Sequence, residues 1–223
     1  MKQIPLALAP DHAQTFDSFV PGANQMAIEH LRQLHASSAP VYLWGPSGSG
    51  KTHLLKALAH RFQQQGGRVG WFDPANPPPW PLDDSLALTV FDACDGFDAE
   101  QQHSAFALFV DATARGTPVA AAGRVPPVDL PLRDDLRTRL GWGHVLAIQP
   151  LSEAESRGAL RREADRRGLF LSDDVIDHLL TRFSRDLKHL MGLLDRLDEF
   201  ALVNKRAITV PLLKQMLNEE RDQ

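Results

Sequence analysis

The stretch Gly45-Pro46-Ser47-Gly48-Ser49-Gly50-Lys51-Thr52 decides the fold of this chain. It matches the pattern G-x-x-x-x-G-K-[S/T] in full, which is the pattern of a phosphate-binding loop. The glycines let the backbone turn its amides toward phosphate oxygens, and the next helix adds the partial positive charge of its N-terminus. Lys51 is expected to reach the β- and γ-phosphates, and Thr52 to place its hydroxyl on Mg²⁺. All eight residues are therefore candidates for nucleotide binding.

The residues on both sides of the loop have the patterns that such a loop requires. A short β-favouring run, 39–44, leads directly into it. After it, Leu54, Leu58 and Phe62 recur every four residues, which predicts an amphipathic helix ending near Gly66. The alternative is a glycine-rich turn that contains Gly-Lys-Thr by chance, and the strand and helix patterns argue against it.

The rest of the chain predicts an α/β domain followed by helices. Apolar runs predict four more strands, at 68–72, 86–91, 119–122 and 144–148. Helical patterns between them indicate a five-stranded parallel sheet, and beyond Pro150 only helical patterns remain, at 152–167, 172–183, 186–203 and 210–219. We therefore expect a flexible arm at 1–14, an α/β nucleotide-binding domain at 15–150 and a small helical lid at 151–223.

Composition narrows the classes of function. The 223 residues carry a net charge of −4, which argues against a protein that mainly grips nucleic-acid backbone. No apolar run is long enough to cross a bilayer, and Pro5, Pro10 and Asp11 interrupt the N-terminal apolar stretch, so we expect no membrane contact, no signal peptide and a cytoplasmic protein. Cys94 is the only cysteine, which excludes an intramolecular disulfide and predicts a small buried side chain.

Three further residues are candidates for the chemistry of a bound nucleotide. Asp92 closes the expected strand 86–91, where a carboxylate can hold the water shell of Mg²⁺; otherwise it is an ordinary strand-end turn residue. Arg139 precedes the last expected strand and could stabilise phosphate charge, although spacing does not separate it from a solvated arginine. Lys188 begins a helix of the expected lid and could contact the nucleotide, although an exposed lysine is the ordinary interpretation.

Several segments together resemble the nucleotide-binding core of the bacterial replication initiator DnaA, an AAA+ protein. They are Thr15-Phe16-Asp17-Ser18-Phe19-Val20-Pro21-Gly22, the phosphate-binding loop, 137–143 and Arg206-Ala207-Ile208-Thr209. The resemblance covers most of the chain from about Thr15 and implies an AAA+ fold. It also implies that Phe19 and Val20 lie against adenine, so that ADP or ATP is the ligand. No counterpart of the initiator's helix-turn-helix domain follows, so we expect no sequence-specific DNA binding.

A short core of this kind with an N-terminal apolar hexapeptide resembles the Hda family, which regulates DnaA. The resemblance implies that the arm docks on the DNA polymerase III sliding clamp (the beta subunit) and that Arg139 enters the ATP site of DnaA as an arginine finger, stimulating hydrolysis there. The expected clamp-binding residues are Gln3, Ile4, Pro5, Leu6 and Leu8. Gln3 can hydrogen-bond at a groove edge while the two leucines fill apolar pockets. A frayed terminus is the alternative for the hexapeptide considered alone.

Two positions depart from the pattern of these families. Ala93 follows Asp92, where AAA+ ATPases usually have an acidic residue that positions the attacking water. Asp95 is a weak substitute, so little or no intrinsic ATPase is expected. Lys188 stands where DnaA-like proteins generally have an arginine; it keeps the charge but loses the bidentate fork.

Three hypotheses of function remain after these observations. The first is a nucleotide-bound negative regulator of replication initiation that acts on DnaA. The second is an autonomous AAA+ ATPase such as a helicase loader, favoured by the complete phosphate-binding loop. The third is an initiator-like fragment that assembles on DNA, against which the net negative charge counts. The oligomeric state is open in all three, a homo-oligomer included.

Overall fold

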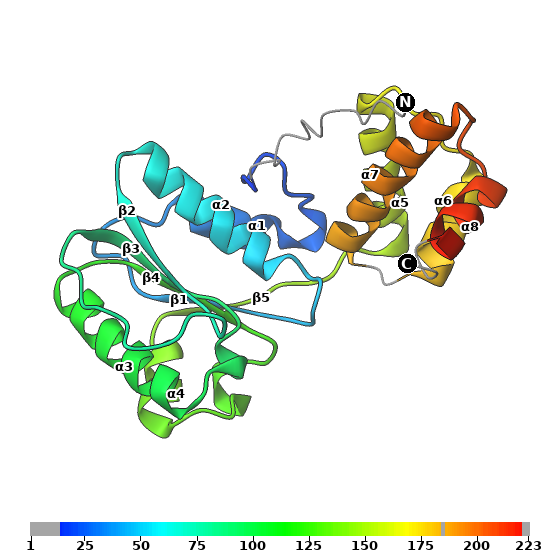
Figure 1. Cartoon of the computed structure of the whole chain (residues 1–223). Coiled ribbons are helices and arrows are strands. Elements are labelled where there is room, and N and C mark those ends of the chain that lie inside the picture. The colour runs from blue at the N-terminus through cyan, green and yellow to red at the C-terminus, as the bar shows by residue number, and fades with distance from the viewer. Residues whose placement is uncertain (1–13, 184–185, 220–223) are drawn as a thin grey trace, which may run out of the picture. The chain divides into compact units, whose positions relative to one another are not determined.

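A computed structural model describes residues 14–183 and 186–219. The chain divides into two units. The first holds a sheet and four helices (Figure 1). The second holds the four C-terminal helices and two short segments, Gly22–Asn24 and Pro46–Ser49. Gly22–Asn24 forms the 3₁₀ turn η1.

The sheet of the first unit has five parallel strands in the order β2-β3-β4-β1-β5. Their bounds are β1 Val41–Trp44, β2 Arg68–Phe72, β3 Leu86–Phe91, β4 Val119–Gly123 and β5 His144–Ala147. β4 pairs with both β1 and β3, with Ala120 opposite Val41 on one side and Val90 on the other. The carboxyl ends of these three central strands therefore share one edge, where open α/β sheets bind ligands.

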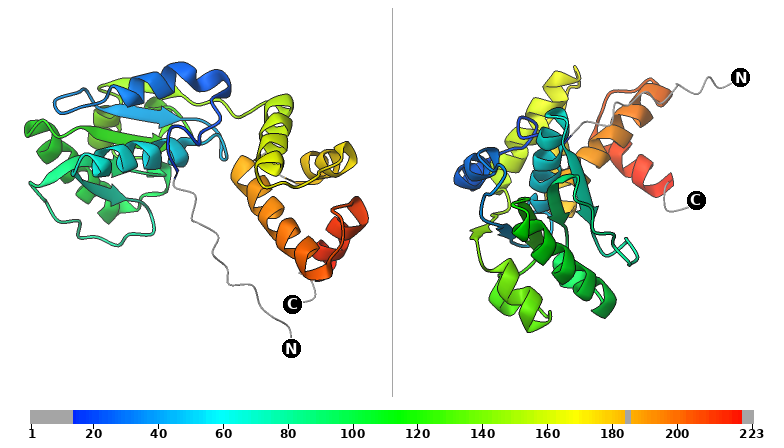
Figure 2. Two further views of the ribbon diagram at one scale, coloured as in Figure 1. Left: turned by 90° about the horizontal axis from the view of Figure 1, so that it is seen from above. Right: turned by 90° about the vertical axis from the view of Figure 1, so that its left-hand side faces the viewer.

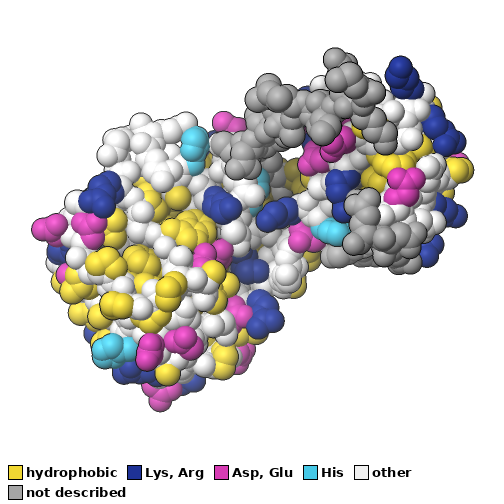
Figure 3. All heavy atoms as spheres, viewed as in Figure 1, with side chains coloured by type: hydrophobic (Ala, Val, Ile, Leu, Met, Phe, Trp, Pro, Cys, Tyr) yellow, Lys and Arg dark blue, Asp and Glu magenta, His cyan; other side chains and the backbone are white. Residues whose placement is uncertain are grey.

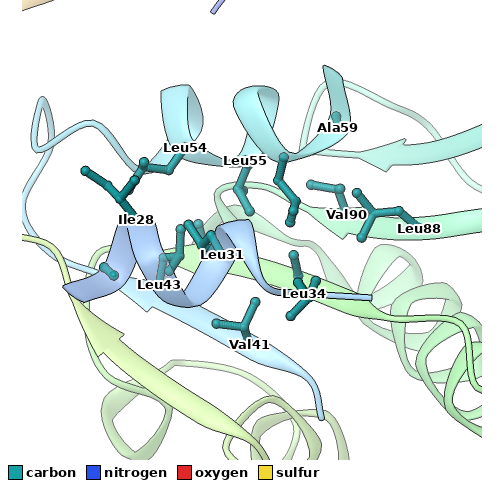
Figure 4. Packing of buried hydrophobic residues seen from close by; sticks show 14 of the residues in the cluster. Ile28, Leu31, Leu34, Val41, Leu43, Leu54, Leu55, Ala59, Leu88 and Val90 are labelled. Atoms are coloured by element: carbon teal, nitrogen blue, oxygen red, sulfur yellow. The ribbon is translucent and has the colours of Figure 1, made fainter. Parts of the chain in front are cut away.

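Helices cover both faces of this sheet (Figures 1 and 2). One face carries α1 Gln25–Arg32 and α2 Lys51–Gln64. Figure 4 shows apolar side chains of both helices pointing toward those of β1 and β3. The labelled residues of this cluster are Ile28, Leu31, Leu34, Val41, Leu43, Leu54, Leu55, Ala59, Leu88 and Val90. The apolar spacing of 54–62 therefore has its expected role, because it presents one face of α2 to the sheet.

The other face of the sheet carries α3 Ala99–Ala114 and α4 Asp134–Leu140. Asp98 caps α3 by accepting from the Gln101 amide at 2.8 Å, as its position before an apolar helix predicts. Two 3₁₀ turns that periodicity does not predict, η2 Cys94–Gly96 and η3 Pro127–Asp129, follow β3 and β4. The Cys94 thiol is fully buried beside the Phe91 carbonyl, and this burial raises its pKa.

The connection between β2 and β3, residues 73–85, contains five prolines and no regular element. Trp80 anchors it, because its ring is buried against Phe72 and Phe91 at centroid distances of 4.9 and 6.3 Å. Figure 3 shows that hydrophobic side chains, in a colouring that includes proline, gather on the visible face of the first unit.

The second unit has a helical core of its own. Its helices are α5 Glu153–Arg166, α6 Asp173–Arg182, α7 Leu187–Asn204 and α8 Val210–Glu219. A capping box begins α5, where Ser152 and Glu155 exchange backbone and side-chain hydrogen bonds, as a serine followed three residues later by a glutamate predicts. Leu190, Leu193 and Leu197 form the buried stripe of α7. The expected five-stranded parallel α/β sheet followed by a C-terminal helical unit is confirmed.

No helix within 14–183 or 186–219 combines the length and apolar character needed to cross a membrane.

Candidate functional site

The phosphate-binding loop connects the end of β1 to the start of α2, as its flanking patterns predict. Two of its glycines adopt left-handed backbone, Gly48 with φ +77° and Gly50 with φ +98°. Glycine at position 50 also has a packing reason, because an added Cβ would lie 2.6 Å from Cε2 of Phe19. The loop therefore has the backbone freedom that a phosphate cradle requires, with the α2 N-terminus directly after it.

Lys51 lies over this loop. Its ammonium donates a hydrogen bond to the Gly45 carbonyl oxygen at 2.8 Å. Burial lowers the pKa of Lys51, while the charges of Asp92 and Asp95 act in the opposite direction. The side chain is thus partly desolvated, and the two carboxylates favour its charged form, which is the form that can bind a phosphate.

Thr52 and Asp92 are brought together at the carboxyl edge of the sheet. The Thr52 hydroxyl donates to Oδ2 of Asp92 at 2.8 Å, and the Ala93 amide donates to Oδ1 at 3.0 Å. Asp92 is 8% exposed, and burial raises its pKa above the usual value. A hydroxyl and a carboxylate side by side are hard oxygen donors of the kind that Mg²⁺ takes, so the residues present fit this ion.

Ala93 and Asp95 decide how water could be activated here. Ala93 has left-handed backbone, with φ +51° and ψ +44°, and its methyl group cannot accept a proton. The Asp95 side chain is 9% exposed and pairs with Arg124, the residue that follows β4. One of its oxygens accepts from the Arg124 amide at 3.1 Å and the other from the guanidinium. Asp95 is therefore occupied by an ion pair, and Arg124, to which the sequence assigned no role, belongs to this edge of the sheet.

The segment before α1 is held against α2 by His53. Its ring contacts Phe19 edge-on, with centroids 5.1 Å apart, and its Nε2 lies 2.9 Å from the Thr15 carbonyl oxygen. Burial lowers the pKa of His53, so the neutral ring is favoured. Phe19 is thus fixed beside Gly50, while contact of Phe19 and Val20 with adenine stays a prediction. Sequence reasoning missed His53, whose only signal is its place directly after Thr52.

The arginines of α4 and its N-cap differ in their partners. Arg133 pairs with Asp135 at 2.7 Å, and Arg137 pairs with Asp134 at 2.6 Å. For Arg139 the structure has no carboxylate partner among the described residues; its guanidinium carbon lies 3.8 Å from the ring centroid of Trp142. This difference, which spacing alone did not reveal, separates Arg139 from its neighbours.

Two other groups of predicted site residues belong to other parts of the chain, one to the second unit and one to the residues that the structure does not describe. Lys188 lies in the second unit, exposed at the start of α7, where its amide donates to Asp186 at 3.0 Å. Its contact with a nucleotide stays a prediction. The expected clamp-binding residues Gln3, Ile4, Pro5, Leu6 and Leu8 lie outside the described residues.

Two family models match different parts of the chain. The lid domain of Hda matches residues 153–217, and the ATPase domain of bacterial DnaA matches residues 11–70. The first match covers the helices of the second unit, and the second covers the Phe19 segment, the phosphate-binding loop and α2.

Solved structures share the fold at low sequence identity. Domain III of the Thermotoga maritima replication initiation protein DnaA is 18% identical, with a TM-score of 0.78 over 94% of this chain and 97% of that one. AMPPCP-bound DnaA from Aquifex aeolicus is 19% identical, with a TM-score of 0.71 over 95% and 71%. The Thermotoga maritima RuvB Holliday junction branch migration motor is 17% identical, with a TM-score of 0.61 over 87% and 68%. Together, this fold and the two family models support a Hda/DnaA-like AAA+ protein.

Proposed function

We propose that this protein is a nucleotide-binding negative regulator of replication initiation that supplies Arg139 to the ATP site of DnaA. The observation that carries the proposal is the state of Arg139. Arg133 and Arg137 have their charge neutralised by carboxylates of α4, whereas Arg139 contacts an aromatic ring. A guanidinium without a carboxylate partner keeps its charge and its N–H donors for an external anion.

The chemistry asked of Arg139 is electrostatic. During ATP hydrolysis, negative charge spreads over the oxygens of the transferred phosphoryl group as water attacks and ADP leaves. A guanidinium placed in the partner's site by complex formation stabilises that charge. Arginine fingers supplied in this way accelerate hydrolysis by about 10³- to 10⁵-fold.

The chain's own nucleotide, ADP or ATP, has a structural role in this proposal. Lys51 and the glycine loop would bind the phosphates, and Thr52, together with Asp92 through water, would hold Mg²⁺. The bound Mg²⁺ would neutralise phosphate charge. Ala93 cannot take a proton from water and Asp95 is engaged by Arg124, so we expect slow intrinsic turnover. AMPPCP-bound DnaA from Aquifex aeolicus, a structural relative, supports an adenine nucleotide as the ligand.

The test of Arg139 uses Arg137 as its matched control. Radiolabelled ATP on DnaA is followed with this protein, the DNA-loaded sliding clamp and DNA present. We expect Arg139→Ala to remove the stimulation of hydrolysis and Arg137→Ala, which breaks only a pair within α4, to retain it. Equal activity of wild type and Arg139→Ala would refute the role of Arg139.

We propose clamp binding from the N-terminal hexapeptide together with its position before a Hda/DnaA-like core. A pull-down with the sliding clamp compares the intact chain with the double variant Gln3→Ala/Leu6→Ala. We expect the double variant to lose the clamp and to keep nucleotide binding, because the phosphate-binding loop is unchanged. Equal retention of both chains would show that the hexapeptide is not a clamp motif.

An autonomous ATPase, such as a helicase loader, is the second candidate function. It is favoured by the complete phosphate-binding loop and by the hydrogen bond between Thr52 and Asp92, which places two oxygen donors of the kind that Mg²⁺ takes side by side. Purified protein with ATP and Mg²⁺ distinguishes the two, because rapid turnover without DnaA supports this candidate. For either function we propose a cytoplasmic protein, and size measurement with and without nucleotide tests for a homo-oligomer.

A further inference from the structure

The contact between Arg139 and Trp142 places the arginine against an exposed aromatic ring. The guanidinium carbon lies 3.8 Å from the centroid of the indole, while Trp142 is 60% exposed. A carboxylate partner would occupy N–H donors and cancel the charge. An aromatic ring attracts the cation through its π face and leaves those donors to other acceptors.

The backbone around Trp142 is fixed on both sides. On the α4 side, the Trp142 amide donates to the Arg139 carbonyl oxygen at 3.1 Å, which closes the end of the helix. On the β5 side, the His144 amide donates to the Pro40 carbonyl oxygen at 2.8 Å, and β5 then pairs with β1. The backbone that carries the indole is therefore anchored between the end of α4 and the start of β5.

Gly143 completes this arrangement. An added Cβ at this residue would lie 1.8 Å from the carbonyl oxygen of Pro40, so any side chain larger than that of glycine would clash with the backbone there. Gly141 is less restricted, because its Cβ would lie 3.5 Å from the nearest atom, an ordinary contact distance. The position of Trp142 is thus set by close packing between residue 143 and the residue before β1.

We propose that Trp142 is the positioning residue of Arg139: its indole holds the guanidinium in place before DnaA arrives and stays beneath it while the guanidinium meets the phosphate. The inference rests on the proposed function, since it concerns how the same arginine is aimed. Without the ring, Arg139 is free to adopt other rotamers, and that freedom is lost on reaching the phosphate.

The first experiment uses the chain alone and does not depend on DnaA. Trp80 is buried and Trp44 and Trp71 are half-buried, so Trp142 dominates the tryptophan emission that acrylamide can quench. We expect Arg139→Ala to uncover the indole and raise quenching, and Arg137→Ala to leave quenching at the wild-type level. Identical quenching in all three proteins would show that the contact is absent in solution and would overturn the inference.

The second experiment measures stimulation of ATP hydrolysis on DnaA as a function of the concentration of this protein. The free energy of a cation–π contact at an exposed site corresponds to a factor of about two to five in a rate or an equilibrium constant. Trp142→Leu should therefore lower the maximal rate of hydrolysis by about that factor. The half-saturating concentration should stay unchanged. Trp142→Phe should recover most of the rate, because a smaller ring still attracts the cation.

The outcomes separate this inference from the function beneath it. If Arg139→Ala retains full stimulation, the proposed function fails. If Arg139→Ala abolishes stimulation while Trp142→Leu matches wild type, only the positioning role fails. A Trp142→Leu variant that changes the half-saturating concentration alone would make Trp142 a partner contact and would also overturn the inference. Thermal unfolding of each variant checks that folding is intact, and Trp142→Gln, which keeps a long side chain without an aromatic ring, provides the same comparison if Trp142→Leu does not fold.

Discussion

The hydrogen bond between Thr52 and Asp92 leads to a prediction about stability that needs no ligand. The substitution Thr52→Val keeps the branched shape and removes the hydroxyl, so Oδ2 of Asp92 loses its 2.8 Å donor. Hydrogen bonds to charged groups contribute about 1.5–3 kcal/mol. Thr52 itself is exposed and water can take over part of the bond, so we expect a loss of about 1–2 kcal/mol in the free energy of unfolding.

Thr113→Val is the matched control for this substitution. The Thr113 hydroxyl donates to the Phe109 carbonyl oxygen at 2.8 Å within α3. No carboxylate depends on that hydroxyl, so we expect a change within about 0.5 kcal/mol. Urea unfolding followed by circular dichroism at pH 7 compares both variants with wild type. Equal stability of Thr52→Val and Thr113→Val would refute the importance of the bond to Asp92.

The pH dependence gives a second check on the same bond. Burial raises the pKa of Asp92 above 3.8, so the folded state favours the protonated carboxyl. This preference adds to the free energy of unfolding below pH 3.8, and the contribution is lost as the pH rises through the pKa of the folded state. The Thr52 hydroxyl lowers that pKa by stabilising the ionised form. The cost of Thr52→Val should therefore be greatest at pH 7 and decrease as the solution is acidified. A cost that does not vary with pH would assign it to side-chain packing.

Three further predictions concern other parts of the chain. Ala93→Gly should raise the free energy of unfolding in urea by about 0.5–1 kcal/mol. Left-handed backbone costs an alanine about 1–2 kcal/mol, and the larger conformational entropy that glycine loses on folding offsets about half of that relief. A destabilised variant would show that Ala93 is not strained. Asn24→Ala should lower the free energy of unfolding by about 1–2 kcal/mol. The buried Asn24 side chain accepts a hydrogen bond from the Gln149 amide at 2.8 Å and donates one to the Gln149 carbonyl oxygen at 2.9 Å. An unchanged urea midpoint would show that water replaces these two hydrogen bonds. Burial and the nearby ring of His144, whose centroid lies 4.2 Å away, lower the pKa of His30 below 6.5. The stability that neutral His30 contributes is therefore present above pH 6.5 and lost as the pH falls below that value. His30→Gln should make the thermal unfolding temperature less dependent on pH between about pH 7 and 5, and an unchanged dependence would assign it to other groups.

The sequence predicted most of the fold because its signals are local. Strand β3 occurs at residues 86–91 as expected, since a short run of apolar residues ending in Asp92 is typical of a strand in the interior of a parallel sheet. The Ser152–Glu155 capping box was readable for the same reason, because both partners lie within four residues. The phosphate-binding loop, with its full pattern and two correct flanks, needed no tertiary information.

The features of the site that the sequence did not predict depend on tertiary contacts. Asp95 and Arg124 lie 29 residues apart and meet only because β3 and β4 are neighbours in the sheet. Spacing could not separate Arg139 from Arg137, because the difference lies in which partner each side chain contacts. An arginine three residues before a tryptophan at a helix end is a local signal for that contact, although periodicity does not detect it.

The buried thiol of Cys94 has a practical consequence. Because this is the chain's single cysteine and its side chain is fully enclosed, maleimide dyes will find no native target on the folded protein. Cysteines introduced at Val128 in the first unit and Phe170 in the second, which are 75% and 84% exposed, can then carry a donor and an acceptor dye without background labelling. Energy transfer between these dyes would report, molecule by molecule, whether nucleotide changes the distance between the sheet and the lid.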